Sequence, residues 1–213
     1  MGHWPSIFSV FERAARSAGP DGLPPMSEIG FTQLLSAAQG GERWAVEGLW
    51  IDLHPRLLRF LQTLAPGSAD DLASDTWLQV ARGLGRFRGG EPEFRAWVFT
   101  IARHRWVDWR RSALRRPTEL LPPEELNWLA APDDPAAEVE ATMGLEAAIR
   151  LVRTLPSDQA EIILLRAVAG LEVGEIARVV HKRSGTVRVL QHRGLRRLAQ
   201  RLGDNSALRL EKL

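Results

Sequence analysis

The sequence predicts an all-α protein made of two small helical domains joined by a flexible acidic linker. Apolar residues recur every three to four positions in both halves of the chain, the period of an amphipathic helix. No stretch alternates apolar and polar residues for long enough to predict a strand. A proline-bearing acidic segment separates the halves, and 213 residues are enough for each half to bury a core.

The expected organisation has five parts. They are an N-terminal extension at 1–29, a helical domain at 30–116, the linker at 117–143, a second helical domain at 144–203 and a tail at 204–213. The extension is expected to be a disordered arm, although Trp4, Ile7, Phe8 and Phe11 leave an amphipathic regulatory helix as the alternative.

Three helices are predicted in the first domain. The first carries an apolar stripe of Trp50, Leu53, Leu57, Phe60, Leu61 and Leu64. The second follows "APGS", where Asp70 and Asp71 favour a helix N-terminus, and its period continues to Leu84. The segment "RFRGGEPE" then breaks the chain, and a third helix starts near Phe94 and runs into a block of arginines.

Four helical pieces are predicted in the second domain. Pro156 starts the second piece, Gly170 ends it, and "HKRSG" is a short break before the last. Two short helices around a tight turn, the second one basic, have the dimensions of a helix-turn-helix. On the last helix, the residues expected to pack inward are Val187, Leu190, Gly194, Leu198 and Leu202, and those expected to face outward are Arg188, Val189, His192, Arg193 and Arg196.

Charge is strongly segregated although the net charge is only +2. Residues 117–149 hold eight acids and no base, whereas 103–116 hold six arginines and 176–203 hold eight Arg or Lys with no acid. Two basic blocks joined by an acidic linker indicate two surfaces for one polyanion. Only Lys182 and Lys212 are lysines; arginine suits bidentate phosphate and base-edge contacts, though GC-rich coding also produces an arginine-rich chain.

The outer face of the last helix is typical of a helix that enters a DNA major groove. Arginine reads guanine edges or phosphates there, and an apolar group such as Val189 can meet a thymine methyl. A merely solvated face usually mixes the signs of its charges, and this face has no acid.

Catalytic, cofactor and metal sites are not expected. The chain has no cysteine, its five histidines lack metal-ligand spacing, and its paired acids are adjacent residues that point to different sides of a helix. No glycine-rich phosphate loop follows a strand. No apolar run approaches the length of a membrane span and no secretory pattern opens the chain, which favours a cytoplasmic protein.

From about Phe31 to Leu202 the chain resembles the extracytoplasmic-function (ECF) group of bacterial sigma-70-type sigma factors. The segment "FTQLLSAAQGGERWAVEGLWIDLHPRLLRFL" is similar to the family's first conserved helices, "DDLASDTWLQVARGLGRFRGG" to region 2.2, and "FRAWVFTIARHRWVDWRR" to regions 2.3 and 2.4. "LPSDQAEIILLRAVAGLEVGEIARVV" and "SGTVRVLQHRGLRRL" resemble region 4.

The resemblance implies a sigma factor that binds core RNA polymerase and directs promoter-specific initiation without cofactor, metal or catalytic activity. Region 2 would hold the clamp helices of the largest subunit and open the −10 element; region 4 would hold the flap of the second-largest subunit and read the −35 duplex. An anti-sigma factor is left open as a further partner. The implied polymerase-binding residues are Asp70, Asp71, Leu72, Asp75 and Trp77. The implied −10 residues are Arg86, Phe87, Arg88, Gly89, Arg103, His104, Arg105, Trp106, Trp109 and Arg110, and the implied −35 residues are Arg183, Ser184, Thr186, Arg188, Val189, His192, Arg193 and Arg196.

Four tryptophans of the first domain divide by position. Trp50 and Trp77 lie on apolar stripes and are expected in the core, whereas Trp106 and Trp109 lie among arginines, where both core packing and stacking on a DNA base remain open.

The sequence departs from the family pattern at Ser74, at His104 and at His181, which stands in a turn where glycine is common. A dimeric helix-turn-helix regulator that acts without polymerase is the alternative, but it gives the first domain no role.

Overall fold

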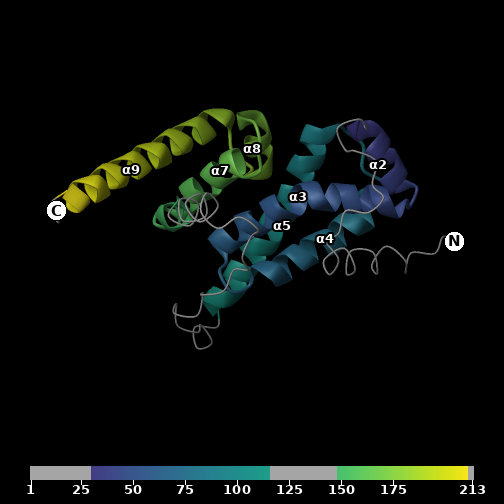
Figure 1. The fold of residues 1–213 in the computed structure, drawn as a ribbon, viewed down its shortest axis with the longest axis horizontal. Helices are drawn as coiled ribbons and strands as arrows, with labels where there is room; N and C mark the ends of the chain where they lie inside the picture. Colours follow the sequence, from purple (N-terminus) through teal and green to yellow (C-terminus); the bar gives the residue numbers. More distant parts are fainter. Residues whose placement is uncertain (1–29, 116–147, 211–213) are drawn as a thin grey trace.

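The computed structural model describes residues 30–115 and 148–210, and every regular element within them is a helix (Figure 1). The all-α prediction is therefore confirmed for this part of the chain. The predicted N-terminal extension and the predicted acidic linker lie outside the described residues.

The N-terminal bundle consists of α2 (Phe31–Gln39), α3 (Arg43–Leu64), α4 (Ala69–Leu84) and α5 (Glu91–Arg115). Gly41 and Gly67 adopt φ values of 88° and 82° in the turns on either side of α3, a conformation that glycine reaches without steric cost. Acidic residues occupy the first turns of α4 and α5, where the helix dipole favours negative charge. The predicted helix start after "APGS" is confirmed, whereas α5 starts at Glu91, three residues before the predicted start near Phe94, with Pro92 in its first turn.

The core of this bundle is built from the predicted apolar stripes. Leu57 and Phe60 of α3 are fully buried, and the Phe60 ring meets Phe99 of α5 edge to face, with ring centroids 5.4 Å apart. Trp77 is buried as expected, at 4% exposure. Trp50 is half-buried and packs on the edge of the core rather than within it.

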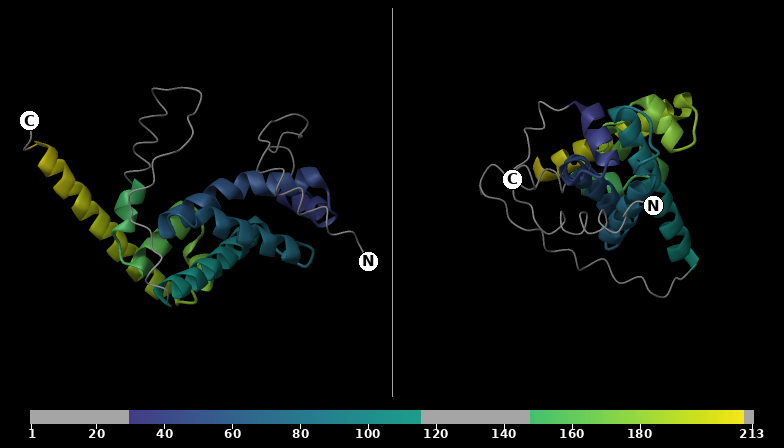
Figure 2. Two further views of the ribbon diagram at one scale, coloured as in Figure 1. Left: turned by 90° about the horizontal axis from the view of Figure 1, so that it is seen from below. Right: turned by 90° about the vertical axis from the view of Figure 1, so that its right-hand side faces the viewer.

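The C-terminal unit contains a helix at 148–153, then α7 (Ser157–Ala167), α8 (Val173–Val179) and α9 (Ser184–Leu210). The four predicted helical pieces are confirmed, and Gly170 ends the second with a φ of 68° in the turn before α8. The helix α9 continues beyond residue 203, where the sequence predicted the start of a tail. It extends away from the rest of the molecule as one long rod (Figures 1 and 2).

The two units lie against each other through α8 on α5 and α7 on α3. Their buried apolar residues form one continuous cluster, so each unit covers part of the surface of the other. Gly170 stands beside the Arg95 guanidinium of α5, where an added Cβ would lie 3.1 Å from Nη1. The turn between α7 and α8 is therefore part of this contact.

Candidate nucleic-acid interface

The outward face of α9 is confirmed as an exposed, entirely basic and apolar surface. Its members, here called the α9 face, are Arg188, Val189, His192, Arg193 and Arg196, all exposed. On the opposite side Val187 is fully buried, and Gly194 packs so closely on α7 that a Cβ would lie 2.6 Å from Cδ1 of Ile163. Val189 is one of the few exposed large apolar residues, at 49% exposure.

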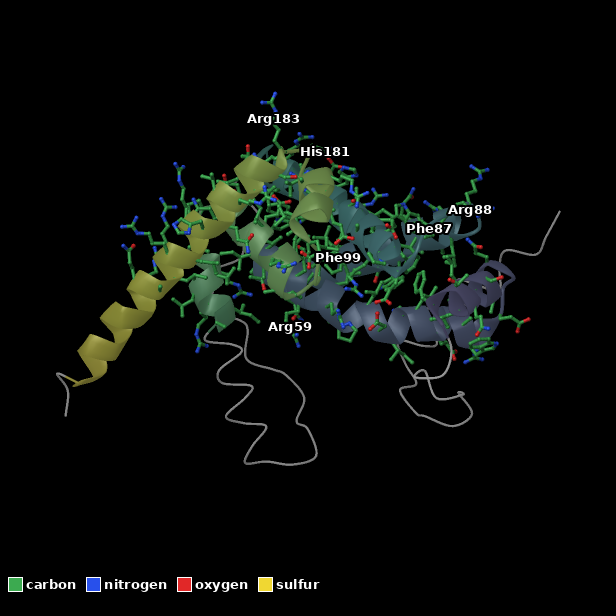
Figure 3. All side chains as sticks on the ribbon, turned by 90° about the horizontal axis from the view of Figure 1, so that it is seen from above. Arg59, Phe87, Arg88, Phe99, His181 and Arg183 are labelled. Atoms are coloured by element: carbon green, nitrogen blue, oxygen red, sulfur yellow. The ribbon has the colours of Figure 1, made fainter. Side chains whose placement is uncertain are left out.

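The turn before α9 places the remaining predicted −35 residues at the helix N-terminus. Ser184 is the first residue of α9, and Arg183 and Thr186 are exposed beside it. Figure 3 shows Arg183 projecting from this end of α9, away from the body of the molecule. Backbone N–H groups at a helix N-terminus favour phosphate, so a positive side chain here adds to an anion-binding end.

His181 adopts a left-handed backbone conformation with a φ of 54°. Because glycine is usual at this turn, the sequence left open whether the backbone is strained or differently shaped; the left-handed φ at a non-glycine residue favours strain. The His181 ring lies nearly parallel to His104 of α5, with ring centroids 6.0 Å apart. A predicted −10 residue and the helix-turn-helix turn are therefore neighbours.

The short helix α8 has a well-formed N-terminus. Glu172 is its N-cap, and Glu172 and Glu175 make a reciprocal capping box, in which the backbone N–H of Glu172 donates to Glu175 Oε2 at 2.6 Å. Arg166 of α7 pairs with Glu172 at 2.6 Å and also donates to the Leu171 carbonyl at 3.0 Å. Glu172 therefore caps the N-terminus of the first helix of the helix-turn-helix, where Ser or Thr is usual.

The predicted polymerase-binding residues separate into two groups. Asp70, Asp71 and Asp75 are exposed along α4, but Leu72 and Trp77 are buried at 6% and 4% exposure. The prediction is corrected for these two. They lie on the apolar face of an amphipathic helix, so they pack α4 on the core and are not available to contact polymerase.

A half-buried histidine of α3 contacts the inner side of this helix. The Trp77 indole N–H donates to Nδ1 of His54 at 3.2 Å, and the His54 ring stacks on Trp50 with centroids 4.2 Å apart. Burial lowers the pKa of His54, while the nearby Asp70 carboxylate acts in the opposite direction. The neutral ring accepts the Trp77 hydrogen bond, which fixes α4 against α3.

The loop 85–90, between α4 and α5, exposes Arg86, Arg88 and Gly89 but not Phe87. Phe87 stacks on Trp97 of α5, with centroids 5.1 Å apart at 26°, and so anchors the loop. The Arg88 guanidinium donates to the Phe87 carbonyl at 2.7 Å. Arg88 and Arg183 point to the same side of the molecule in Figure 3, and Arg59 points to the opposite side.

The third predicted group lies on α5 and is only partly available. His104 and Arg110 are exposed, and Arg105 and Trp109 are half-buried. Trp106 is 3% exposed, which corrects the prediction that it contacts DNA: no base can reach it in this arrangement. It belongs to the cluster of buried residues that continues from the N-terminal bundle into the C-terminal unit. Arg110 lies over the Trp106 ring at 5.4 Å, so this tryptophan carries a cation instead of a base.

Arg103 makes an ion pair with Glu161 of α7 and is largely enclosed. Glu161 is 4% exposed, and burial raises the pKa of its carboxyl, against the opposing effects of Arg103, Lys182 and Arg110. Arg110 also donates to the Ser157 hydroxyl of α7 at 3.1 Å. Glu161 is not among the residues predicted from the sequence, although it is the lone acid within the apolar run "QAEIILL", a pattern that indicates a buried charge.

Within residues 30–115 and 148–210, no group of three or more His, Asp or Glu side chains is placed to hold a metal ion. No helix in that part of the chain is both long and apolar enough to cross a membrane.

The chain matches two family models in order along its length. Residues 49–116 match Sigma-70 region 2, and residues 145–198 match Sigma-70 region 4. The ECF sigma factor ShbA of Streptomyces griseus is 34% identical over 176 residues, which cover 78% of this chain and 91% of ShbA. The ECF sigma factor BldN of Streptomyces coelicolor is 33% identical over 82% of this chain and 66% of its own length.

A solved structure supports the same fold. The sigma factor RpoE of Bartonella quintana, determined in complex with the anti-sigma factor NepR, superposes with a TM-score of 0.56 at 23% identity, over 74% of this chain and 98% of RpoE. The family models, the relatives and the two-unit helical fold agree, and the chain belongs to the ECF group of sigma-70-type RNA polymerase sigma factors.

Proposed function

We propose that this ECF sigma factor divides promoter recognition between its two units, with α9 reading the −35 duplex and the N-terminal bundle opening the −10 element. Sigma factors direct RNA polymerase to promoters, so what is proposed is which residues of this chain do it. The observation that carries the proposal is the α9 face, which is exposed, has no acid and includes one apolar side chain. The presence of region 2 ahead of region 4 argues against a helix-turn-helix regulator that works without polymerase.

For the −35 element, the α9 face lies on one side of a straight helix whose far side is packed on α7. Its members are Arg188, Val189, His192, Arg193 and Arg196. That fixed packing determines which side chains can enter a major groove, because the helix cannot roll without displacing Gly194 from Ile163. Arg183, Ser184 and Thr186 at the N-terminus are suited to phosphate, which sets the docking register.

For the −10 element, the exposed residues are those of the loop 85–90 and the outer side of α5. Arg86, Arg88 and Gly89 surround a loop whose backbone is held by packed aromatic rings, as capture of a flipped base requires. On α5 we assign His104, Arg105, Trp109 and Arg110 to the opened strand. The buried Trp106 is reassigned to positioning Arg110.

Arg103 gains access to DNA only if α7 moves away from α5. It pairs with Glu161 in this arrangement, and the His104 ring faces His181, which belongs to the C-terminal unit as Glu161 does. Engaging the −10 strand therefore requires Glu161 to be exchanged for phosphate as the partner of Arg103. Separation of the two units by polymerase would provide that exchange.

For the polymerase, we propose Asp70, Asp71 and Asp75 as the contact surface for the largest-subunit clamp helices. They are exposed on one helix that the buried Leu72 and Trp77 hold in place. The flap of the second-largest subunit is assigned to the C-terminal unit. Since RpoE binds the anti-sigma factor NepR, a partner of that kind is also proposed for this chain.

The test is in vitro transcription with core RNA polymerase and a genomic promoter library. We expect specific transcripts only when the chain is present, and loss of those transcripts in the Asp71→Arg variant, with Asp52→Arg, at an exposed acid of α3, as the control. The same transcripts from core polymerase alone, at an unchanged rate, would overturn the proposed function.

A further inference from the structure

We infer that Gln39, the last residue of α2, is a positioning residue for the loop that we propose captures the −10 base. The inference rests on the proposed function of the loop 85–90. The helix α2 lies outside residues 49–116, which the region 2 model matches, so this role is not carried by that match. It depends on two hydrogen bonds that join segments far apart in the chain.

The Gln39 side-chain amide donates both of its hydrogens to backbone carbonyls, one at the end of α4 and one in the loop. Nε2 lies 2.9 Å from the Leu84 carbonyl and 2.8 Å from the Phe87 carbonyl. The Leu84 carbonyl at the end of α4 also accepts from the Phe87 backbone N–H at 3.1 Å, so the first bond adds a second donor where the helix passes into the loop. The second bond fixes the loop at the residue between the exposed Arg86 and Arg88.

Aromatic packing fixes the same residue from the other side. The Phe87 ring stacks on Trp97 and meets Phe94 edge to face, with centroids 5.3 Å apart at 79°. Phe31 of α2 lies against Phe94, with centroids 5.7 Å apart. The ring of Phe87 is thus held by α5 and its carbonyl by Gln39, so the flanking arginines project from a backbone with little freedom. Such preorganisation is what a base-capturing loop needs, because ordering the loop on binding would weaken affinity.

The amide is matched to this task because it offers two donors on one nitrogen. Methionine has nearly the same length and no donor, so Gln39→Met removes both bonds and keeps the volume. Lysine keeps donors within reach of both carbonyls. Gln33→Met changes an exposed glutamine of the same helix and is the matched control.

The experiment uses holoenzyme reconstituted from core polymerase and each full-length variant. The probe is a pool of single-stranded oligonucleotides randomised over six positions, from which bound sequences are recovered and read. We expect wild type, Gln33→Met and Gln39→Lys to select the same preferred bases. Gln39→Met should bind the preferred sequence about tenfold more weakly, equivalent to about 1.4 kcal/mol, with the preference flattened at one position, since both hydrogen bonds that order the loop are lost.

Thermal unfolding of each chain measures any loss of stability separately. A merely structural role of Gln39 would weaken binding to all sequences equally and leave the base preference unchanged. Unchanged preference in Gln39→Met, or equal loss in Gln39→Met and Gln39→Lys, overturns the role of Gln39 while the proposed function stands. If the wild-type holoenzyme selects no sequence, the proposed function fails, and this inference fails with it.

Discussion

Arg103→Ala should destabilise the protein strongly at neutral pH and only slightly at pH 5. The substitution leaves the Glu161 carboxylate buried, at 4% exposure, without its ion-pair partner. Removing one member of a buried pair typically costs about 3–5 kcal/mol. Glu161 can avoid part of this cost by taking up a proton. The free energy of that protonation sets an upper limit on the stability lost in Arg103→Ala.

The limit follows from the ordinary pKa of the carboxyl, 4.5. Protonating it at pH 7 costs about 1.36 kcal/mol for each of about 2.5 pH units, or about 3.4 kcal/mol. At pH 5 the same cost is about 0.7 kcal/mol. The sign agrees with linkage: a carboxyl whose folded-state pKa is raised favours the folded state at pH values below its unfolded pKa, and this stabilisation is lost as the pH rises through the folded pKa.

The assay is urea unfolding of the full chain, followed by tryptophan fluorescence at pH 7 and pH 5. Glu161→Gln should cost less than Arg103→Ala at pH 7, because the amide oxygen can still accept from Arg103 and burial already works against the charged carboxylate. The double variant Arg103→Ala/Glu161→Gln should lose the pH dependence of the single Arg103→Ala variant. Arg111→Ala, in an exposed pair with Asp108, is the control and should cost no more than about 1 kcal/mol. An Arg103→Ala cost that is equal at both pH values would refute the buried pairing of α5 with α7.

Three other experiments test the site and the packing. Arg188→Ala should cost about 1–3 kcal/mol at the −35 duplex and relax one base position, whereas Arg201→Ala, 13 residues and roughly 20 Å along α9, should only lower the salt dependence of binding; titration of −35 variants at two salt concentrations distinguishes them. His181→Gly should raise the free energy of unfolding by about 0.5–1 kcal/mol, since glycine tolerates the φ of 54°, and an unchanged or lowered urea midpoint would contradict this. Gly83→Ala should cost about 1–3 kcal/mol, because its Cβ would lie 2.6 Å from Cζ2 of the rigid Trp97 ring; Gly185→Ala, in open space, should show no such loss when both are unfolded in urea.

Several parts of the fold were predictable because their causes are local. The starts of α4 and α5 follow from acids and glycines within a few residues, and the inward and outward faces of α9 follow from helical period alone. The same holds for the strained turn at His181, where the lack of glycine was visible in the sequence. The predicted segregation of charge also placed the basic face of α9, since a run without acids is basic on every side that reaches solvent.

Helical period alone could not show which helices cover which faces. Trp106 lies among arginines in the sequence, as a DNA-facing tryptophan would, but it belongs to the buried cluster shared by the two units and is 3% exposed. Leu72 and Trp77 were grouped with neighbouring aspartates by motif, although the helix turns them to the opposite side.

The sequence by itself determined the helices, their amphipathic faces and the family, because these depend on residue type and short-range spacing. Only the tertiary structure decided that Arg103 pairs with Glu161, 58 residues away. The same is true of the hydrogen bonds from Gln39 to Leu84 and Phe87, which lie 45 and 48 residues later in the chain. Such pairings depend on how two helix surfaces meet in space. A charge or an amide has the same local pattern whether it faces water, DNA or another helix, so its partner is fixed by packing and cannot be read from its neighbours in the chain.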